Sequence, residues 1–576
     1  MNTPETRTAN APAALDKKPL QAAPRPTAAV TASAASAASL ATLSSAVLAA
    51  CGGGGDAAPS PGPAPAGVSR VQASRLLSQA AFGGTASEID NVRALGLQGW
   101  LDQQYALPQS QSHVDWMRAN GYEAAAPNSA NIDRTGVTRS VWRKLIASPD
   151  GLRQRVTLAL SEIFVISLIP VVLPYRGFAS AAFLDGLETN AFGNYRDLLV
   201  HVSKSPAMGA YLSFLNNVKG DPVTGSMPDE NYAREVMQLF SIGLLQLNLD
   251  GTPILVGGAP QPTYLQADVT QLARVFTGWR LTPGTTVGPA DFVIRPMSSN
   301  AAQHETGTST FLGVTVPAGN DGQTSLELAI TTFMNHPSMG PFIGRQLIQR
   351  LVTSNPSPAY VQRVATAFNG GAGRAKGDMK ATLTAILTDP EATSDATLTA
   401  VDHGKLREPM VRFVQWARTF GLNSADNTWD IGDLSSTVSG LAQSPLRSPS
   451  VFNFFRPGYV PPASSLGDRS ITAPEFQITN ETSVAGYVNF MQKVVGRGIA
   501  GMLPNYAALL PVSGDAAALL AELNVLLAAG QISAATLAPL ATALASIDAS
   551  TAAGQANRIN AALTLVMAAP EYLVQK

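Results

Sequence analysis

The residues with the strongest potential for acid–base chemistry lie in one short stretch, residues 229–239, which reads D-E-N-Y-A-R-E-V-M-Q-L. On a helix, Glu230 and Arg234 are one turn apart and form an ion pair. Asn231 and Glu235 have the same spacing and form a second pair. Glu230 and Glu235 lie about 140° apart around the helix, so their side chains diverge. A glycosidase-type pair of carboxyl groups therefore needs a partner from elsewhere in the chain.

Asp268 and Glu305 are the most obvious partners. Glu305 follows His304 in an irregular segment, and loops often carry catalytic groups. In such a site one carboxyl group acts as a general acid with a pKa raised by burial, while Arg234 holds an anionic or hydroxyl-rich ligand. Glu235 borders the apolar face of the helix, where a carboxylate needs a partner. The candidate catalytic residues are thus Glu235, Glu230, Asp268, His304 and Glu305, and the enzyme hypothesis requires them to line one cleft.

The same side chains also have a purely structural interpretation, in which the two helix pairs tie the start of the helix to neighbouring loops. The sequence leaves both interpretations open. One imidazole beside one carboxylate lacks the spacing of a metal site, so we predict neither a metal nor a cofactor. Serine-nucleophile motifs, phosphate-binding loops and dinucleotide fingerprints are absent from the sequence as well.

Ligand binding is the second kind of chemistry that the sequence suggests. Residues 452–459 read F-N-F-F-R-P-G-Y, and such rings stack on sugars or other apolar ligands while Arg456 acts as a polar clamp. Core packing is the alternative use of these aromatic residues. The candidate binding residues are Arg234, Asn231, Trp279, Phe454, Arg456 and Tyr459.

The first 67 residues differ in composition from the rest, being rich in Ala, Ser, Pro, Thr and Gly. The box Leu48-Ala49-Ala50-Cys51 contains the only cysteine of the chain and resembles the cleavage site of a bacterial lipoprotein signal. We therefore expect residues 1–50 to be a signal, Cys51 to carry the lipid, and residues 51–67 to be a flexible tether. Gly52 favours delivery to the outer membrane in such lipoproteins. The alternative is an ordinary disordered leader with an accidental cysteine.

Composition and charge exclude several classes of protein. Hydrophobic residues make up 45% of the chain and charged residues 14%, which indicates a large globular core. The formal net charge is −1, without the clustered Lys and Arg of a nucleic-acid binder. Beyond the leader, no apolar run is long enough to cross a bilayer.

Helical periodicity dominates from residue 68 onward, so we expect a mainly α protein: one large helical domain, residues 68–576, with long loops and a few short strands. Ser69 and Thr85 are predicted to cap the first two helices, and the second is predicted to stop at Gly96. Asp268 is a further predicted N-cap. Other helices are expected at residues 325–334, 341–352, 358–368, 378–388, 405–420 and within 516–568. The central helix is expected to carry Pro228, Asp229 and Glu230 in its first turn and to stop at Gly243.

Several motifs, taken in order, resemble the bacterial family known as domain of unknown function 1800: A-S-R-L-L-S-Q-A-A-F-G (73–83), D-E-N-Y-A-R-E-V-M-Q-L (229–239), A-D-V-T-Q-L-A-R-V-F-T-G-W (267–279), H-E-T-G (304–307) and R-S-P-S-V-F-N-F-F-R-P-G-Y (447–459). Asp229 stands where the family usually has Asn, and Glu305 stands where it usually has Asp. The resemblance implies a largely helical, frequently exported protein, often encoded beside a sulfatase-like protein. It does not imply a reaction.

Two functional hypotheses follow. In the first, the protein is an envelope hydrolase or lyase that acts on an extracytoplasmic polymer through the candidate catalytic residues. In the second, it is a non-catalytic envelope scaffold or carbohydrate-binding protein whose charged helix is architectural. The expected partners are the membrane, through the lipid anchor, and an envelope polysaccharide or a sulfatase-like protein.

Overall fold

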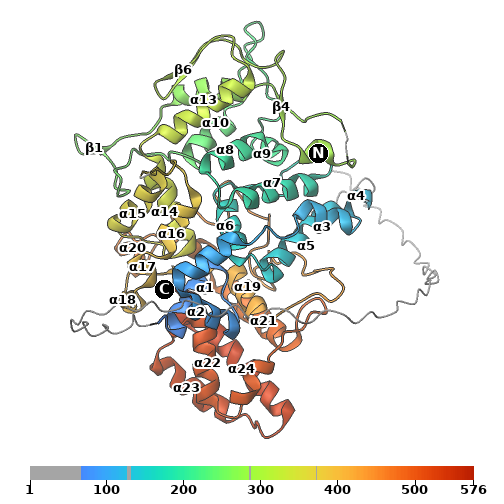
Figure 1. Cartoon of the computed structure of the whole chain (residues 1–576), viewed down its shortest axis with the longest axis vertical. Helices are drawn as coiled ribbons and strands as arrows, with labels where there is room; N and C mark the ends of the chain where they lie inside the picture. The colour runs from blue at the N-terminus through green and yellow to red at the C-terminus, as the bar shows by residue number, and fades with distance from the viewer. Residues whose placement is uncertain (1–66, 126–131, 285–286, 372) are drawn as a thin grey trace, which may run out of the picture. The chain divides into compact units, whose positions relative to one another are not determined.

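Helices joined by long loops form the described part of the chain, and the strands are short and pair only two by two (Figure 1). The computed structural model of the protein describes residues 67–125, 132–284, 287–371 and 373–576. All of these residues belong to one compact unit. The predicted mainly α fold is therefore confirmed.

The helices of the first half are α1 (Arg70–Ala80), α2 (Ala86–Ala106), α3 (His113–Ala119), α4 (Tyr122–Ala125), α5 (Ile132–Ala147), α6 (Gly151–Ser161), α7 (Arg176–Asn190), α8 (Tyr195–Lys204), α9 (Pro206–Tyr211), α10 (Asn231–Gln238), α11 (Gln266–Ala273) and α12 (Asp291–Ile294). Those of the second half are α13 (Gly322–Asn335), α14 (Met339–Leu351), α15 (Pro358–Asn369), α16 (Met379–Leu387), α17 (Pro390–Thr393), α18 (Ala396–Thr399), α19 (Pro409–Thr419), α20 (Ser465–Asp468), α21 (Glu481–Arg497), α22 (Ala516–Ala528), α23 (Ala534–Ala545), α24 (Ala552–Ala568) and α25 (Pro570–Leu573).

The strands form four antiparallel pairs: β1 (Leu255–Val256) with β2 (Ala259–Pro260), β3 (Trp279–Arg280) with β4 (Ser298–Ser299), β5 (Ser309–Phe311) with β6 (Val314–Val316), and β7 (Lys405–Leu406) with β8 (Val574–Gln575). Three of these pairs join neighbouring parts of the chain. The fourth joins residues 574–575 to residues 405–406, which lie just before α19.

Capping residues define where the first two helices begin, as predicted. The side chains of Ser69 and Thr85 each accept a hydrogen bond from a backbone N–H of the first turn, and both capping boxes are complete. Gly96 has φ 73°, which interrupts the helix at the predicted position, but a second helical segment continues to the end of α2. The break is thus a kink rather than an end.

Long-range pairing overrides the prediction of a helix from residue 405. Lys405 and Leu406 instead form β7, which pairs with Gln575 and Val574. Helix α19 begins at Pro409, because a proline fits the first turn and disfavours helical geometry in the residue before it.

The central helix α10 is shorter than predicted and begins at Asn231, with Glu230 as its N-cap residue. The Asp229 carboxylate accepts a hydrogen bond from the backbone N–H of Asn231 at 2.8 Å, a local bond that competes with an earlier helix start. The helix ends at Gln238, and the chain then turns through Gly243 at φ 73°. Tyr232 anchors this segment in the core, with its ring 4.1 Å from that of Phe214.

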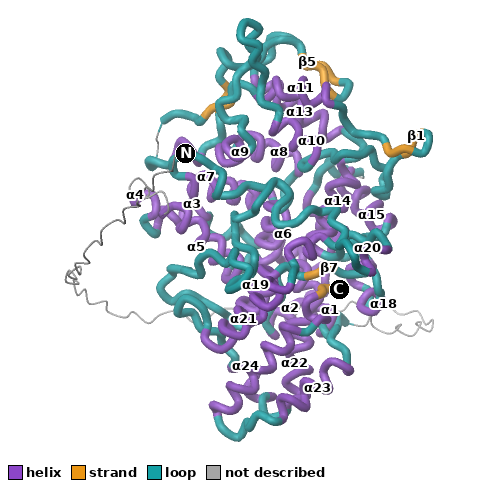
Figure 2. Tube along the Cα trace, turned by 180° about the vertical axis from the view of Figure 1, so that it is seen from behind, coloured by secondary structure: helices purple, strands orange, loops and turns teal. Residues whose placement is uncertain are grey.

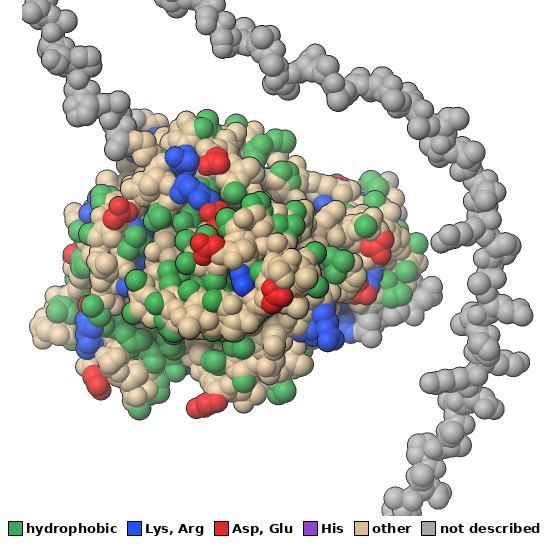
Figure 3. Space-filling view, turned by 90° about the horizontal axis from the view of Figure 1, so that it is seen from below, with side chains coloured by type: hydrophobic (Ala, Val, Ile, Leu, Met, Phe, Trp, Pro, Cys, Tyr) green, Lys and Arg blue, Asp and Glu red, His purple; other side chains and the backbone are tan. Residues whose placement is uncertain are grey.

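Helix α1 lies at the centre of the helical unit, where it contacts α2, α6 and α22. Figure 1 shows it in blue between the yellow helices α14 to α16 and the red C-terminal helices. Figure 2, the view from behind, shows in teal how much of the chain between the helices is loop. On the face drawn in Figure 3, Lys and Arg side chains are interspersed with Asp and Glu and do not form a large patch of one sign. Among the described residues, no helix combines the length and apolarity needed to cross a bilayer.

Candidate ligand-binding cavity

Glu230 and Arg234 form the predicted ion pair, with 3.4 Å between Arg234 Nη2 and Glu230 Oε2. Glu230 also accepts hydrogen bonds from Thr270 Oγ1 at 2.7 Å and from Gln266 Nε2 at 2.8 Å. Arg234 donates to Gln266 Oε1 at 3.0 Å. These contacts join the start of α10 to α11.

The predicted pair between Asn231 and Glu235 is wrong. The Asn231 side chain donates instead to Ser213 Oγ at 3.4 Å, and Oε2 of Glu235 has no hydrogen-bond partner among the described residues. Burial raises the pKa of Glu235, and the charge of Arg234 only partly offsets this effect. Burial, together with the negative charge of Glu235, raises the pKa of Tyr211 to about 12.

Asp268 lies at the third position of α11 rather than at its N-cap, which is Leu265. Its two carboxylate oxygens accept the backbone N–H of Leu265 at 2.7 Å and that of Leu312 at 2.8 Å. The sequence pattern misplaced the cap by three residues because a capping box uses an acidic side chain at this third position. Asp268 thereby ties the start of α11 to the β5–β6 hairpin.

His304 and Glu305 fasten the segment after β4 to the end of α11. His304 is buried, with Nδ1 3.0 Å from the carbonyl oxygen of Thr277. Glu305 lies 3.3 Å from Arg274 and accepts the backbone N–H of Gly307 at 2.9 Å. Although burial acts in the opposite direction, these two groups lower the pKa of Glu305. None of the five candidate catalytic side chains lines the cavity formed by the candidate binding loop.

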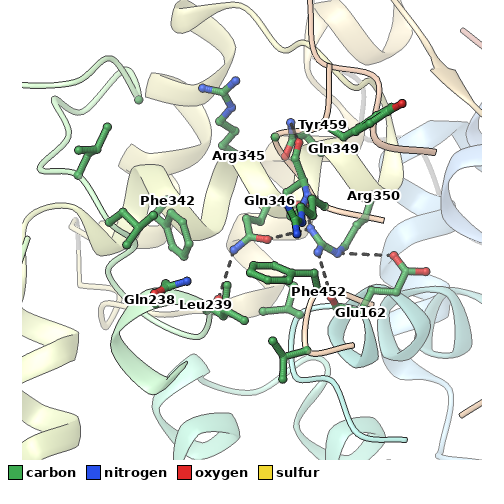
Figure 4. Close-up of a pocket in the computed structure, with 18 of the residues that line it drawn as sticks. Glu162, Gln238, Leu239, Phe342, Arg345, Gln346, Gln349, Arg350, Phe452 and Tyr459 are labelled. Carbon is green, nitrogen blue, oxygen red and sulfur yellow. Dashed lines mark hydrogen bonds and ion pairs between the residues drawn. The ribbon is translucent and has the colours of Figure 1, made fainter. Parts of the chain in front are cut away.

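That cavity has a volume of about 650 Å³ and lies between the end of α10, helix α14 and the loop of residues 451–460 (Figure 4). Most of its wall is aliphatic or aromatic. Its lining residues include Glu162, Leu239, Leu244, Leu245, Phe342, Arg345, Gln346, Gln349, Arg350, Phe452, Arg456 and Tyr459. Cavities of this size and apolarity are typical of small-molecule sites.

The candidate binding residues are divided between the cavity and other places. Arg456 and Tyr459 line the cavity, and the Arg456 guanidinium lies 5.2 Å from the ring centre of Phe452. Phe454 lines a neighbouring cavity of about 50 Å³. Trp279 is buried in the core, with its indole N–H directed to the carbonyl oxygen of Val275.

Helix α14 supplies a polar stripe that sequence reasoning missed. Its cavity-facing side chains are Phe342 and the four polar residues of the stripe, Arg345, Gln346, Gln349 and Arg350. This spacing of three and four residues marks one face of a helix. The sequence did contain a signal for it, because these four polar residues interrupt an otherwise apolar helix at regular spacing. Gln346 also donates to the carbonyl oxygen of Leu239 at 3.3 Å, which fixes α14 to the end of α10.

Two of the cavity's guanidinium groups have no acidic partner. Within the described part of the chain, no Asp or Glu forms an ion pair with Arg345 or Arg456. Both residues are exposed overall, although the surrounding protein lowers the pKa of Arg345 through burial. Glu162 is the acidic residue of the wall. Burial, followed by the negative charge of Glu408, raises the pKa of Glu162 to about 8.

Arg350 connects the cavity to a buried ionic network. It lies 3.5 Å from Glu162 and donates to Gln346 Oε1 at 3.0 Å. Beneath it, Lys405 lies 3.0 Å from Glu475 and donates to the Arg350 carbonyl oxygen at 2.8 Å. These buried groups form one polar network that extends from the cavity wall into the core.

A separate cluster, buried His113 and Glu188 with half-buried Asp185, brings potential metal-ligating atoms within 4.8 Å of one another. The ammonium group of Lys144 already hydrogen-bonds to Glu188. Although burial opposes ionisation, His113 and Lys144 lower the pKa of Glu188 to about 2. Since a cation is already supplied by the protein, we assign this cluster a structural role.

Comparison with family models identifies one match, a protein family of unknown function (DUF1800), over residues 75–574. Comparison with curated proteins and with solved structures gave no match. The matched region contains α10, α14 and the 451–460 loop, and with them the whole cavity. Because the family model covers most of the sequence, the chain belongs to the DUF1800 family.

Proposed function

We propose that this protein binds an acidic ligand with an apolar body in the cavity between α10, α14 and the 451–460 loop. The observation that carries the proposal is the presence of two guanidinium groups, Arg345 and Arg456, that have no acidic partner among the described residues, in a mostly apolar wall. Guanidinium groups bind carboxylates, sulfates and phosphates through paired hydrogen bonds.

The charge balance of the cavity favours an anion. With a pKa of about 8, Glu162 is mostly protonated at neutral pH and contributes little negative charge. Arg345, Arg350 and Arg456 then give the wall a net positive charge, which attracts an acidic ligand into an apolar space where the interaction is strengthened.

The chemistry of the wall favours an amphiphile over a neutral polysaccharide. Aliphatic side chains such as Leu239, Leu244 and Leu245 cannot hydrogen-bond to sugar hydroxyls, whereas they pack well against an alkyl chain or a fused ring. The amides of Gln346 and Gln349 can orient the polar end of the ligand. This proposal is a form of the binding hypothesis rather than the polymer-degrading one.

A hydrolase or lyase is the second candidate function. The feature that favours it is Glu162, a carboxyl group at the cavity wall whose pKa is raised by burial, as a general acid requires. The five candidate catalytic residues of the sequence lie outside this cavity. The contacts of Glu230, Asp268 and His304 join neighbouring segments of the fold, whereas Glu235 has one buried oxygen without a hydrogen-bond partner among the described residues. If catalysis occurs, Glu162→Gln abolishes turnover while the ligand still binds.

We also propose that the protein is exported and anchored through lipidated Cys51 to the outer membrane. The support is the sequence box around this only cysteine of the chain. Metabolic labelling with a clickable palmitate analogue should label the wild-type protein and not the Cys51→Ser variant. Labelling of the variant, or a wild-type protein that remains in the cytosolic fraction, would refute this part.

A pair of fluorescent probes tests the binding proposal. 8-Anilino-1-naphthalenesulfonate (ANS) carries a sulfonate on an apolar ring system, and N-phenyl-1-naphthylamine (NPN) is its neutral counterpart. ANS should bind more tightly than NPN, and the double variant Arg345→Gln/Arg456→Gln should lose this preference while it binds NPN as before. Equal affinities for the two probes in the wild-type protein would reject an anion-binding cavity.

A further inference from the structure

The loop of residues 244–265, which carries the β1–β2 hairpin, exposes a concentration of apolar side chains next to the cavity. They are Leu244, Leu245, Leu249, Leu255, Val256 and Leu265, with Leu255 and Val256 exposed to 58% and 63%. Figure 1 shows the hairpin projecting from the helices at the position labelled β1. Single exposed apolar residues are ordinary, but a contiguous group marks an interaction surface.

Several backbone groups of this loop are hydrogen-bonded to one another. The N–H of Gln246 donates to the carbonyl oxygen of Gln261, and the N–H of Ile254 donates to that of Gln246, both at 2.8 Å. Gly257 and Gly258 both have positive φ and close the hairpin with the two-residue turn that suits paired strands. These backbone bonds lower the cost of moving this part of the loop into an apolar environment.

The charge of the loop is equally low. Asp250 is its only charged residue, and the carboxylate accepts a hydrogen bond from the backbone N–H of Thr252 at 2.9 Å. A protein partner would ordinarily be matched by charged or hydrogen-bonding groups at the rim of the surface. A loop with apolar tips and almost no charge matches the apolar boundary of a membrane instead.

We propose that the loop of residues 244–265 rests on the surface of a lipid bilayer and inserts Leu255 and Val256 into it. Leu244 and Leu245 belong both to this surface and to the cavity wall. On the basis of the proposed function, an acidic amphiphile can thus pass from the bilayer into the cavity without crossing water. Fifteen residues separate Cys51 from Gly67, a contour length of at most about 50–60 Å, so the proposed lipid anchor would hold Gly67 within that distance of a membrane.

The test uses the full chain with Cys51→Ser, which removes the lipid acceptor and leaves no other thiol. Leu255→Cys in this background is labelled with an environment-sensitive nitrobenzoxadiazole probe and mixed with vesicles of phosphatidylethanolamine and phosphatidylglycerol. The matched control is Leu503→Cys, which replaces a leucine of similar exposure, 68%, outside the loop.

We expect a blue shift and a severalfold rise in emission for the probe at position 255 and no change at position 503. Adding Val256→Asp should remove the response. No response at position 255, or equal responses at both positions, would overturn the proposal. ANS binding in solution needs no vesicles, so intact ANS binding without a vesicle response rejects the membrane surface alone, and the reverse result rejects the cavity proposal alone.

Discussion

The guanidinium group of Arg350 lies 3.5 Å from the carboxyl group of Glu162 at the wall of the cavity, and both side chains are buried. Neither oxygen of Glu162 accepts a hydrogen bond from a described residue. The protonation state of Glu162 therefore determines whether the positive charge of Arg350 is balanced at this part of the cavity wall. It also affects the stability of the fold.

Glu162→Gln should flatten the pH dependence of stability. The ordinary pKa of the carboxyl group is 4.5, and its pKa in the folded protein is about 8. Between these values the folded protein holds a proton that the unfolded chain has lost, so the free energy of unfolding falls with rising pH by up to ~1.4 kcal/mol per pH unit. The stabilising contribution of protonated Glu162 is fully present below pH 4.5, the ordinary pKa, and is lost as the pH rises through about 8, the pKa in the folded protein. Urea denaturation across this range measures it.

Glu188 is the matched control, because it is also a fully buried glutamate but has a pKa lowered to about 2. Its contribution is present above the unfolded pKa and is lost as the pH falls through the folded one. Glu188→Gln should therefore destabilise most at neutral pH and progressively less in acid. A Glu162→Gln curve parallel to that of the wild-type protein would show that Glu162 is ionised in the fold.

Gly243→Ala should destabilise the protein more than the backbone conformation alone explains. Gly243 has φ 73°, and a Cβ atom there would meet Phe342 at 2.6 Å. The left-handed conformation costs a non-glycine residue roughly 1–3 kcal/mol, and displacement of Phe342 from the cavity wall adds to it. Thermal denaturation measures the sum.

Gly313→Ala separates the two effects. Gly313 has φ 74° and no atom within 4 Å of the added Cβ, so it reports the backbone cost alone. The Gly243 variant should also bind ANS more weakly, and the Gly313 variant should not. Equal losses of stability at the two positions would show that Phe342 moves aside at no cost.

Much of the helical architecture was predictable from local signals, whereas the cavity was not. Ser69 and Thr85 act through neighbours three residues away, so their caps are readable in the sequence. The strand at Lys405 depends on its pairing with Gln575, and no local sequence pattern predicts pairing over this distance along the chain. The pKa of Glu162 likewise depends on burial and on Glu408, which lies far away in sequence.

Glu230 tests the structural interpretation of the central helix. Its carboxylate accepts a hydrogen bond from Thr270 across the α10–α11 contact, and its side chain is one-third exposed. Glu230→Ala should therefore lower the free energy of unfolding by about 1–2 kcal/mol. In a double-mutant cycle with Thr270→Val, the losses should not add, because both remove the same bond. Additive losses, or an unchanged stability with loss of ligand binding, would favour a functional role.

The position of a bound anion tests the central claim most directly. A crystal structure of the protein with ANS should show its rings against Leu239 and Phe342 and its sulfonate within hydrogen-bonding distance of Arg345 or Arg456. A sulfonate directed into solvent away from both guanidinium groups, or ANS bound only outside this cavity, would contradict the account.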